Sequence, residues 1–372
     1  MNIWFVQSAP RDLLGGGEIF AVRLASWLKS RGHTVRLVAR PGSRLEAAAK
    51  AVWLDVRTLA MRNDLDWWSR RTLRRCFAAD RPDVVFGAFG RDIKLLGLGA
   101  RAAGARVFWL QGIPLSDGSR VHARLDRKFV DGYIVPSQHL KEELIRRAGI
   151  DPAKIDVVHP ALDPKPFEPD QSVADYGDRF RLGQKIAVSA PVAICPARLI
   201  EGKGQQVLLD AWASVVKEQP DAYLLFAGEG PCKGALQAQT RRLGLESRVR
   251  FLGHLSDIRP ALWVSDLMIL PTLSDSFPVV VLEAMASGLA VVASRVGGIP
   301  EQMIDQESGL LVPPGDAGAL AAAILRVLSD AGLRMALVRG GGARALEFTA
   351  DRCFPALEAR IARGPAAGVP CA

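Results

Sequence analysis

The feature that most constrains this chain is the alternation of short apolar runs with longer helical patterns along most of its 372 residues. Each strand of a parallel sheet is buried on both faces and needs a crossover, usually a helix, before the next strand. The alternation therefore predicts an α/β fold with doubly wound parallel sheets. The expected strands are residues 2–7, 34–39, 51–55, 83–86, 105–110, 132–135 and 155–158, then 192–195, 222–227, 249–252, 264–270, 289–293 and 310–312.

Helical patterns fit the intervening segments, and the clearest of them indicate the domain organisation. They include residues 18–31, 138–148, 317–328, 332–345 and 351–362. The alternation lapses between about residues 160 and 184, where four prolines and several acids discourage regular structure. A chain of this length also exceeds the size at which one core keeps growing. We therefore expect two Rossmann-like domains, 1–165 and 186–348, joined by a linker at 166–185.

Composition excludes several other classes of protein. The chain is 49% hydrophobic and 23% charged, as expected of a soluble globular protein. Its five cysteines are odd in number and scattered without CxxC or Cys/His spacing, which favours a reducing compartment and argues against a structural zinc site. The opening MNIWFVQSAP has no basic leader and too short an apolar run for a signal peptide or a membrane span, so we expect a first strand there. The last residues, rich in Gly, Pro and Ala, are expected to be disordered.

The excess of positive over negative charge is confined to the first half of the chain. Residues 1–170 hold 28 Lys and Arg against 19 Asp and Glu, whereas residues 171–372 hold 20 of each. Two explanations stay open: solvated arginine-rich faces, or a surface that meets an anionic membrane leaflet or a phosphorylated glycolipid. A potential helix near residue 70 combines tryptophans with arginines, with Leu65, Trp68 and Leu73 available for burial, as in interfacial helices. Its basic and aromatic residues are Trp67, Trp68, Arg70, Arg71, Arg74 and Arg75. No nucleic-acid recognition module accompanies them.

The stretch PTLSDSFPVVVLEAMASG at 271–288 predicts a helix between two buried strands. A helix that begins where a parallel strand ends presents unpaired N–H groups and partial positive charge to the crevice above the sheet, which suits a phosphate. Two acids, Asp275 and Glu283, are separated by seven intervening residues, one at the helix start and the other inside the helix. Both can face the same crevice.

This stretch resembles the Glu, seven residues, Glu motif of the retaining GT-B glycosyltransferases of family 4, with Asp275 in place of the first Glu. The resemblance implies that Asp275 contacts hydroxyl groups of the donor sugar and that Glu283 holds the ribose. It implies that amides at the helix start hold the diphosphate, near Phe277, Pro278 and Val279. It also implies that the last helix, within 349–372, crosses back to the first domain.

The second half carries further segments similar to this family. Arg198 and Lys203, in PARLIEGKG after a strand, match its Arg and Lys-Gly pair, and two fixed cations can offset the charge that builds up on a diphosphate leaving group. They make a metal ion unnecessary, and none is expected. Gly228 belongs to a glycine turn that borders the nucleotide in the family, and the backbone at His254 is expected to contact the base. The loop at 296–301 is similar to one that flanks the sugar site.

The first half is matched mainly in architecture. Gly16 and Gly17 lie in a glycine loop that follows the first strand. The glycines of this loop are too closely spaced for a GxGxxG fingerprint. The resemblance places such a loop against the donor or the acceptor. Gln111 stands where the family often carries a histidine near the reacting sugar; it can hydrogen-bond a hydroxyl but cannot shuttle a proton. For Asp92 two interpretations stay open: it points at the acceptor, or it begins the next helix.

The function that these patterns favour is retaining transfer of a sugar from a UDP- or GDP-sugar to a hydroxyl acceptor. No carboxylate nucleophile is evident, so front-face displacement assisted by the departing phosphate is the expected route. The expected acceptor is a bacterial envelope glycolipid such as a lipopolysaccharide core. The expected location is the cytoplasm, peripheral on the inner membrane. The alternatives are a nucleotide-sugar epimerase and a catalytically silent nucleotide-sugar-binding protein. A phosphorylase would need a pyridoxal lysine segment, and this sequence does not contain one.

Overall fold

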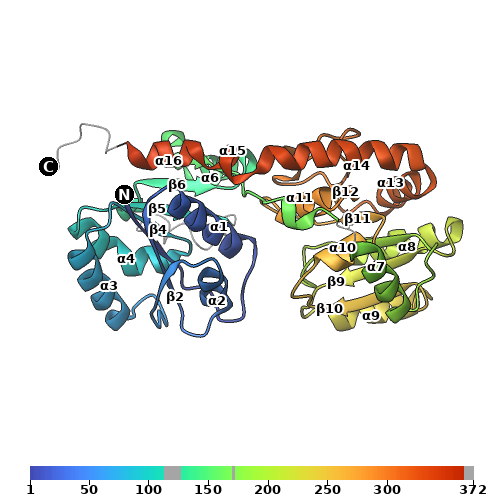
Figure 1. Cartoon of the computed structure of the whole chain (residues 1–372), viewed down its shortest axis with the longest axis horizontal. Helices are drawn as coiled ribbons and strands as arrows, with labels where there is room; N and C mark the ends of the chain where they lie inside the picture. Colours follow the sequence, from blue (N-terminus) through green and yellow to red (C-terminus); the bar gives the residue numbers. More distant parts are fainter. Residues whose placement is uncertain (113–126, 170–171, 364–372) are drawn as a thin grey trace. The chain divides into compact units, whose positions relative to one another are not determined.

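The chain divides into two compact units in a computed structural model that describes residues 1–112, 127–169 and 172–363 (Figure 1). Unit 1 comprises Met1–Ala161 together with the chain from Ala350 onward, and unit 2 comprises Leu162–Thr349. The chain thus passes between the units twice. The N–H group of Leu162 donates a hydrogen bond to the carbonyl oxygen of Phe348 (2.8 Å), so the two ends of unit 2 lie side by side.

Unit 1 is built on a seven-stranded parallel sheet in the order β3-β2-β1-β4-β5-β6-β7. Its strands are β1 (Asn2–Val6), β2 (Thr34–Ala39), β3 (Asp55–Thr58), β4 (Val84–Gly87), β5 (Arg106–Leu110), β6 (Gly132–Val135) and β7 (Ile155–Val157). The order runs outward in both directions from β1 and β4, and these two strands therefore flank the switch point of the sheet. The doubly wound arrangement predicted from the alternation is confirmed.

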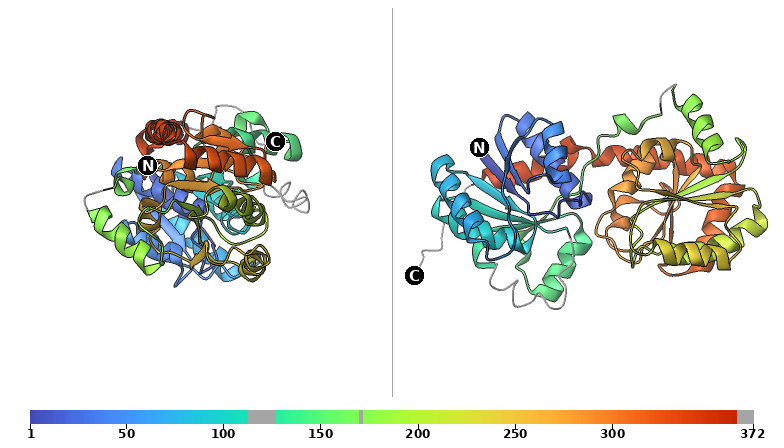
Figure 2. Two further views of the ribbon diagram at one scale, coloured as in Figure 1. Left: turned by 90° about the vertical axis from the view of Figure 1, so that its right-hand side faces the viewer. Right: turned by 90° about the horizontal axis from the view of Figure 1, so that it is seen from below.

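Helices cover both faces of this sheet, as Figure 2 shows. Because successive strand side chains point to opposite faces, Phe5 packs toward one layer and Trp4 toward the other. The first layer holds α1 (Gly16–Ser30) and α2 (Arg44–Ala51), and the second holds α3 (Trp67–Asp80), α4 (Gly90–Ala102) and α6 (Gln138–Ala148).

The end of the chain completes the first layer of unit 1. It forms α15 (Ala350–Cys353) and α16 (Pro355–Ala362), which is drawn in red near α1 in Figure 1. Phe354 is fully buried between Phe20 and Trp27, with ring centroids 5.9 and 5.7 Å away. The Trp27 indole also donates a hydrogen bond to Asp351 (2.7 Å). The final segment thus supplies part of the core beneath α1. The predicted disordered tail, residues 364–372, lies outside the described residues.

Two element predictions in unit 1 were wrong in detail. The strand expected at 51–55 instead begins at Asp55, because α2 ends at Ala51 and Trp53 turns the chain with a positive φ of 58°. The single helix expected at 351–362 is interrupted at Phe354. Pro355 has no N–H group and disfavours helical geometry in the residue before it, so a new helix starts there.

The arginine-rich helix near residue 70 exists as α3, but two of the three residues predicted to be buried, Leu65 and Trp68, are exposed, and only the prediction for Leu73 is confirmed. Leu73 and Phe77 are buried, whereas Leu65 and Trp68 are 83% and 74% exposed. Leu65 precedes the cap residue Asp66 and so lies outside the helix, and the inward face is set by residues four apart, Leu73 and Phe77. The aromatic residues at the start of α3 therefore face solvent.

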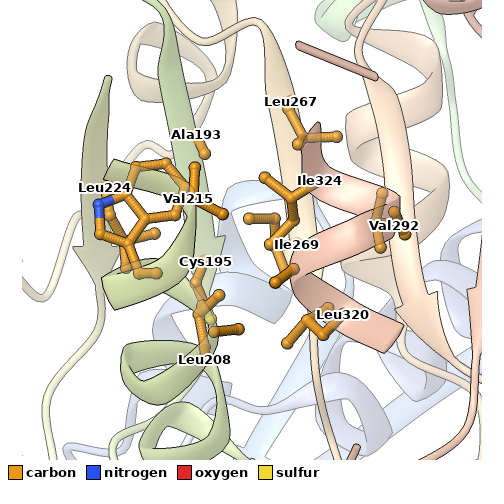
Figure 3. Packing of buried hydrophobic residues seen from close by; sticks show 14 of the residues in the cluster. Ala193, Cys195, Leu208, Val215, Leu224, Leu267, Ile269, Val292, Leu320 and Ile324 are labelled. Carbon is orange, nitrogen blue, oxygen red and sulfur yellow. The ribbon is translucent and has the colours of Figure 1, made fainter. Parts of the chain in front are cut away.

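Unit 2 repeats the same winding with a six-stranded parallel sheet in the order β10-β9-β8-β11-β12-β13. Its strands are β8 (Val192–Pro196), β9 (Tyr223–Ala227), β10 (Val249–Gly253), β11 (Leu267–Leu270), β12 (Ala290–Ser294) and β13 (Leu310–Val312). Its helices are α8 (Gln205–Glu218), α9 (Lys233–Arg242), α10 (Arg259–Trp263), α11 (Val279–Ala286), α12 (Ile299–Gln302), α13 (Ala317–Ser329) and α14 (Ala331–Ala345). Figure 3 shows the core on one face, where Cys195 and Ile269 meet Leu208 of α8 and Ile324 of α13.

The segment predicted as an irregular linker, 166–185, is largely helical. It contains α7 (Ser172–Gly183), which starts after the last proline of the segment, Pro169. The guanidinium of Arg181 donates hydrogen bonds to the carbonyl oxygens of Ala190 and Val264 (2.7 Å each). This segment is therefore part of unit 2. The proline count misled the prediction, because the prolines end before the helix begins.

The packing of Phe354 gives a direct test of the returning segment. Phe354→Ala should lower the free energy of unfolding of unit 1 by about 3–5 kcal/mol, because it removes a fully buried ring. Leu98→Ala, which truncates an exposed side chain of α4 in the same unit, should change it by less than about 0.5 kcal/mol. Urea unfolding followed by tryptophan fluorescence measures both. Equal effects of the two substitutions would contradict the packing.

Candidate functional site

The candidate site lies in unit 2 at the carboxyl ends of β8 and β11, the two strands that flank the switch point. In open α/β sheets, ligands bind in the crevice at this point. The loop after β8 carries Lys203 and the loop after β11 carries Asp275. Their side chains form an ion pair of 2.5 Å between Nζ and Oδ2, and each is 19% exposed. The sheet topology thus brings together two residues predicted from separate motifs.

The two loops are fixed to each other through their backbones. Gly204 has a φ of +71°, and a Cβ there would lie 1.9 Å from the carbonyl oxygen of Pro271. The N–H group of Leu273 donates to the carbonyl oxygen of Gly202 (2.8 Å). The hydroxyl of Thr272, which is buried, also contacts that oxygen (3.2 Å). Only glycine at 204 allows this approach, which places Lys203 next to Asp275.

A third loop, after β9, packs against the loop after β8. A Cβ at Gly228 would lie 2.1 Å from the carbonyl oxygen of Ala197, and one at Gly230 would lie 2.2 Å from that of Leu199. The N–H group of Leu199 donates to the carbonyl oxygen of Glu229 (3.0 Å). Gly228, predicted to border the nucleotide, therefore lies directly beside the segment that carries Arg198.

The Arg198 side chain is exposed at this edge. Its carbonyl oxygen accepts a hydrogen bond from the Gln205 side chain (2.9 Å), which fixes its backbone. Among the described residues, its guanidinium forms no ion pair. Arg198 is thus a cation held at its backbone with its head group available for an anion.

Helix α11 follows the Asp275 loop and carries Glu283 in its second turn, half-buried. The N-cap residue is Pro278, which offers no capping side chain. The side chains of Phe277 and Val279 are buried, so the contacts predicted for these positions would have to come from their backbones. The first N–H groups of a helix have no partner within it, and they are suited to an anion beside Asp275.

The loop after β12 closes against Asp275 from another side. Gly297 has a φ of +56°, and a Cβ there would lie 1.7 Å from the carbonyl oxygen of Asp275. The N–H group of Gly298 donates to the same oxygen (3.3 Å). The loop at 296–301 is therefore in contact with the Asp275 backbone.

His254 lies apart from these loops in the sheet order. It is exposed after β10, at the carboxyl edge of the same sheet but two strands from β8.

The remaining predicted residues belong to unit 1. Gly16 and Gly17 begin α1, and space for a Cβ is open at both. Gln111 is buried directly after β5, and its N–H group donates to the carbonyl oxygen of Ile134 (2.9 Å). They are not part of the constellation described in unit 2.

Asp92 is completely buried at the switch point of unit 1. Its carboxylate accepts hydrogen bonds from the N–H groups of Ser8 (2.9 Å), Ala88 (3.1 Å) and Phe89 (2.9 Å). Burial raises its pKa to about 6, although these hydrogen bonds act in the opposite direction. Of the two interpretations left open by the sequence, the geometry favours the helix start, because the side chain is enclosed and ties the β1 and β4 loops together.

Sequence reasoning missed Thr272 and Gln302 as parts of this site. Gln302 is buried at the end of α12, and its side-chain amide donates to the carbonyl oxygen of Pro278 (3.0 Å). A polar residue within an otherwise apolar stretch is a weak signal, and the contact joins positions 24 residues apart. Only the fold identifies it. Burial also raises the pKa of the Cys195 thiol to about 12, which disfavours its thiolate form.

Two family models match long parts of this chain. A model described as "Glycosyl transferases group 1" matches residues 190–330, and one described as "Glycosyltransferase Family 4" matches residues 14–165. Together they cover well over half of the chain. The chain belongs to glycosyltransferase family 4. The model that matches residues 190–330 spans the carboxyl edge of β8 and β11, where Lys203 and Asp275 meet.

Curated relatives of this family 4 chain carry sugar-transfer names. D-inositol 3-phosphate glycosyltransferase of Corynebacterium kroppenstedtii is 34% identical over 229 residues, 59% of this chain and 50% of that protein. A human protein named as part of phosphatidylinositol N-acetylglucosaminyltransferase is 28% identical over 326 residues, 81% of this chain and 63% of that protein. The chain spans about half the length of most of the curated relatives it matches.

The fold of this family 4 chain is GT-B, as in solved glycosyltransferases. The structure of Anabaena HepE in complex with UDP superposes with a TM-score of 0.85 at 21% identity, covering 97% of this chain and all of that one. Within the described part of the chain, no helix combines the length and apolar character needed to cross a bilayer.

The close approach at Gly297 yields a test of the site's construction. Gly297→Ala should shift the Asp275 loop and lower the free energy of unfolding by more than about 3 kcal/mol, because a backbone clash adds to the strain of a positive φ. Gly288→Ala provides the control: its φ of +76° is also positive, but nothing lies within 4 Å of the added Cβ. It should cost about 1 kcal/mol. Similar losses in thermal unfolding would show that Gly297 is not in contact with Asp275.

Proposed function

We propose that this chain transfers a sugar from a nucleotide diphosphate sugar, UDP- or GDP-linked, to a hydroxyl group of an acceptor, with retention of the anomeric configuration. The observation that carries the proposal is the Lys203–Asp275 pair at the switch point of unit 2. A cation for a phosphate and a carboxylate for a sugar hydroxyl stand there in direct contact, beside Arg198 and the start of α11.

The proposed chemistry follows from where charge develops. When the bond between the sugar and the diphosphate breaks, negative charge grows on the leaving phosphate oxygens. Arg198 and Lys203 would stabilise that charge, together with the N–H groups at the start of α11. Cations held by the fold before the reaction need little reorganisation during it. On this proposal no metal ion is required, and activity should persist in the presence of a chelator.

Two carboxylates would hold the donor. Asp275, kept in place by Lys203 and by the Gly297 loop, is positioned for hydroxyl groups of the sugar. Glu283, in the second turn of α11, would accept hydrogen bonds from the ribose hydroxyls. Neither is proposed as a nucleophile. The acceptor hydroxyl would attack from the side of the departing phosphate, which would take up its proton and leave the anomeric configuration unchanged.

The proposed acceptor is a phosphate-bearing glycolipid or polyol. The relatives named above are named for inositol 3-phosphate and phosphatidylinositol, and unit 1 carries the excess positive charge of the chain. An envelope glycolipid such as a lipopolysaccharide core fits the same chemistry. The shared requirement is an anionic group near the hydroxyl that is glycosylated.

We also propose that the enzyme is cytoplasmic and binds the anionic inner face of a membrane through the start of α3. Leu65, Trp67 and Trp68 are exposed there, and the Arg71 guanidinium lies 5.4 Å from the centroid of the Trp67 ring. Helix α3 carries four arginines in its first three turns and no acid before Asp80. Tryptophans that enter the head-group region beside arginines are typical of interfacial anchors.

An alternative is a nucleotide-sugar-binding protein without transferase activity. It is favoured by the shorter Asp275 and by Gln111 in place of the family histidine. Such a protein would bind the donor and leave it unchanged, whereas an epimerase would convert the donor without any acceptor. Turnover of donor with and without phosphorylated acceptors separates the three.

Glu283→Ala should weaken nucleotide binding about a hundredfold and abolish transfer while leaving folding nearly unchanged, because two hydrogen bonds to a carboxylate are lost. Glu218→Ala, on the exposed end of α8, is the control. Titration calorimetry with the best of UDP, GDP and ADP from a thermal-shift screen measures the effect. Unchanged nucleotide affinity in Glu283→Ala would contradict the assignment of Glu283 to the ribose.

Arg198→Ala should lower turnover more than donor affinity, because the proposed role of Arg198 is to stabilise the charge that grows on the departing phosphate. Unaltered turnover in this variant would contradict that role.

The membrane proposal is tested by sedimentation with vesicles of phosphatidylcholine and phosphatidylglycerol. Trp67→Ala combined with Trp68→Ala should reduce binding at least about tenfold, because two exposed indoles can no longer enter the interface. Trp53→Ala is the matched control: this tryptophan of unit 1 is also exposed, but it precedes β3, whereas the α3 tryptophans follow it. Binding should fall with added salt. Binding that ignores both lipid charge and the double substitution would contradict the proposal.

A further inference from the structure

Helix α11 is not capped by its own sequence. Its N-cap residue is Pro278, which makes no side-chain capping hydrogen bond to the first turn. The carbonyl oxygen of Pro278 instead accepts a hydrogen bond from Gln302 Nε2 (3.0 Å), and Gln302 is completely buried. A carbonyl oxygen can only accept, so the amide nitrogen must face it. The position of the α11 start therefore depends on a residue outside the helix.

Gln302 is the last residue of α12, and α12 touches the Asp275 loop at both of its ends. At its beginning, Gly297 and Gly298 pack against the carbonyl oxygen of Asp275. At its end, Gln302 contacts Pro278. The segment thus spans the four residues from Asp275 to the helix cap, and a shift of α12 would move both.

Helix α12 has only four residues, too few to be stable alone. Arg344 of α14 donates hydrogen bonds to the carbonyl oxygens of its last two residues, Glu301 (2.7 Å) and Gln302 (3.1 Å). These are the unpaired carbonyl groups at a helix end, where a cation is favourable. One guanidinium therefore satisfies two carbonyl groups at the end of α12.

Arg344 reaches the same loop by a second route. Its guanidinium lies over the ring of Phe348 (4.9 Å), and that ring meets Phe277 edge-on with centroids 5.6 Å apart. Phe277 lies between Asp275 and Pro278 in the loop. Arg344 also pairs with Glu347, in the 3-10 turn (Leu346–Phe348) that follows α14.

We propose that Arg344, acting through Gln302, is a positioning residue for the donor site: it holds α12 so that Asp275 and the N-terminus of α11 stay in register. This rests on the proposed function for its effect on donor binding, but the positioning itself can be tested without ligand. Neither side chain needs to touch the donor. The chain of contacts has three steps. The Arg344 guanidinium contacts the end of α12, that end carries the Gln302 amide, and the amide contacts the N-cap residue of α11, Pro278.

The test uses Arg344→Met, Gln302→Leu and Arg344→Lys in the full chain. Hydrogen–deuterium exchange of the amides of residues 275–286 should accelerate in the first two variants while residues 192–218, which span β8 and α8, stay unchanged. Affinity for the best-binding of UDP, GDP and ADP should fall about tenfold. Arg344→Lys, which keeps a donor for one carbonyl, should restore part of both effects.

Arg339→Met is the matched control, because Arg339 is an exposed arginine of the same helix that forms no ion pair within the described part of the chain. It should leave exchange and affinity unchanged. Unaltered exchange at 275–286 in Arg344→Met and Gln302→Leu would overturn the proposal, and so would equal acceleration in residues 192–218. If the wild-type protein binds none of the three nucleotides, the donor assignment fails while the exchange result still decides the positioning role.

Discussion

The site in unit 2 depends on backbone segments that approach each other more closely than any side chain would allow. Gly204 lies against Pro271, Gly228 against Ala197, and Gly297 against Asp275. Each contact joins loops from two different strands at the carboxyl edge of the sheet. Charged side chains on flexible loops would repel or drift, but loops locked through their backbones hold a cation, a carboxylate and a helix start in fixed places.

The sequence predicts much of this arrangement because the signals are local. Apolar runs such as those at Val192 and Leu310 are bounded by turn residues, and their strand positions agree with the structure within a residue or two. The pairing of Lys203 with Asp275 follows once the order of the sheet is known, since two loops at neighbouring strand ends must meet. The residues named in the motifs of unit 2 therefore fall where a parallel sheet would put them.

The predictions that were wrong, and the residue that was not predicted, depend on tertiary contacts and not on local signals. The prolines before residue 170 indicated an irregular linker, but α7 is held by tertiary contacts, including the hydrogen bonds of Arg181 to distant carbonyl groups. The exposure of Trp68 depends on which face of α3 meets the sheet, and a helix with many arginines and two tryptophans gives no clear apolar stripe. Gln302 acts across a separation that sequence patterns do not encode. Local propensity cannot report contacts that form only when the chain has folded.

The hydrogen bond between Leu162 and Phe348 has a consequence for how the chain is assembled. Because the entry and exit of unit 2 are neighbours, unit 2 is an insertion whose ends meet, flanked by two pieces of unit 1 that are distant in sequence. Modules with adjacent termini are the ones that tolerate excision, transplantation and circular permutation. Unit 2 thus has the adjacent ends of an exchangeable module, whereas unit 1 is complete only after α15 and α16 have been synthesised.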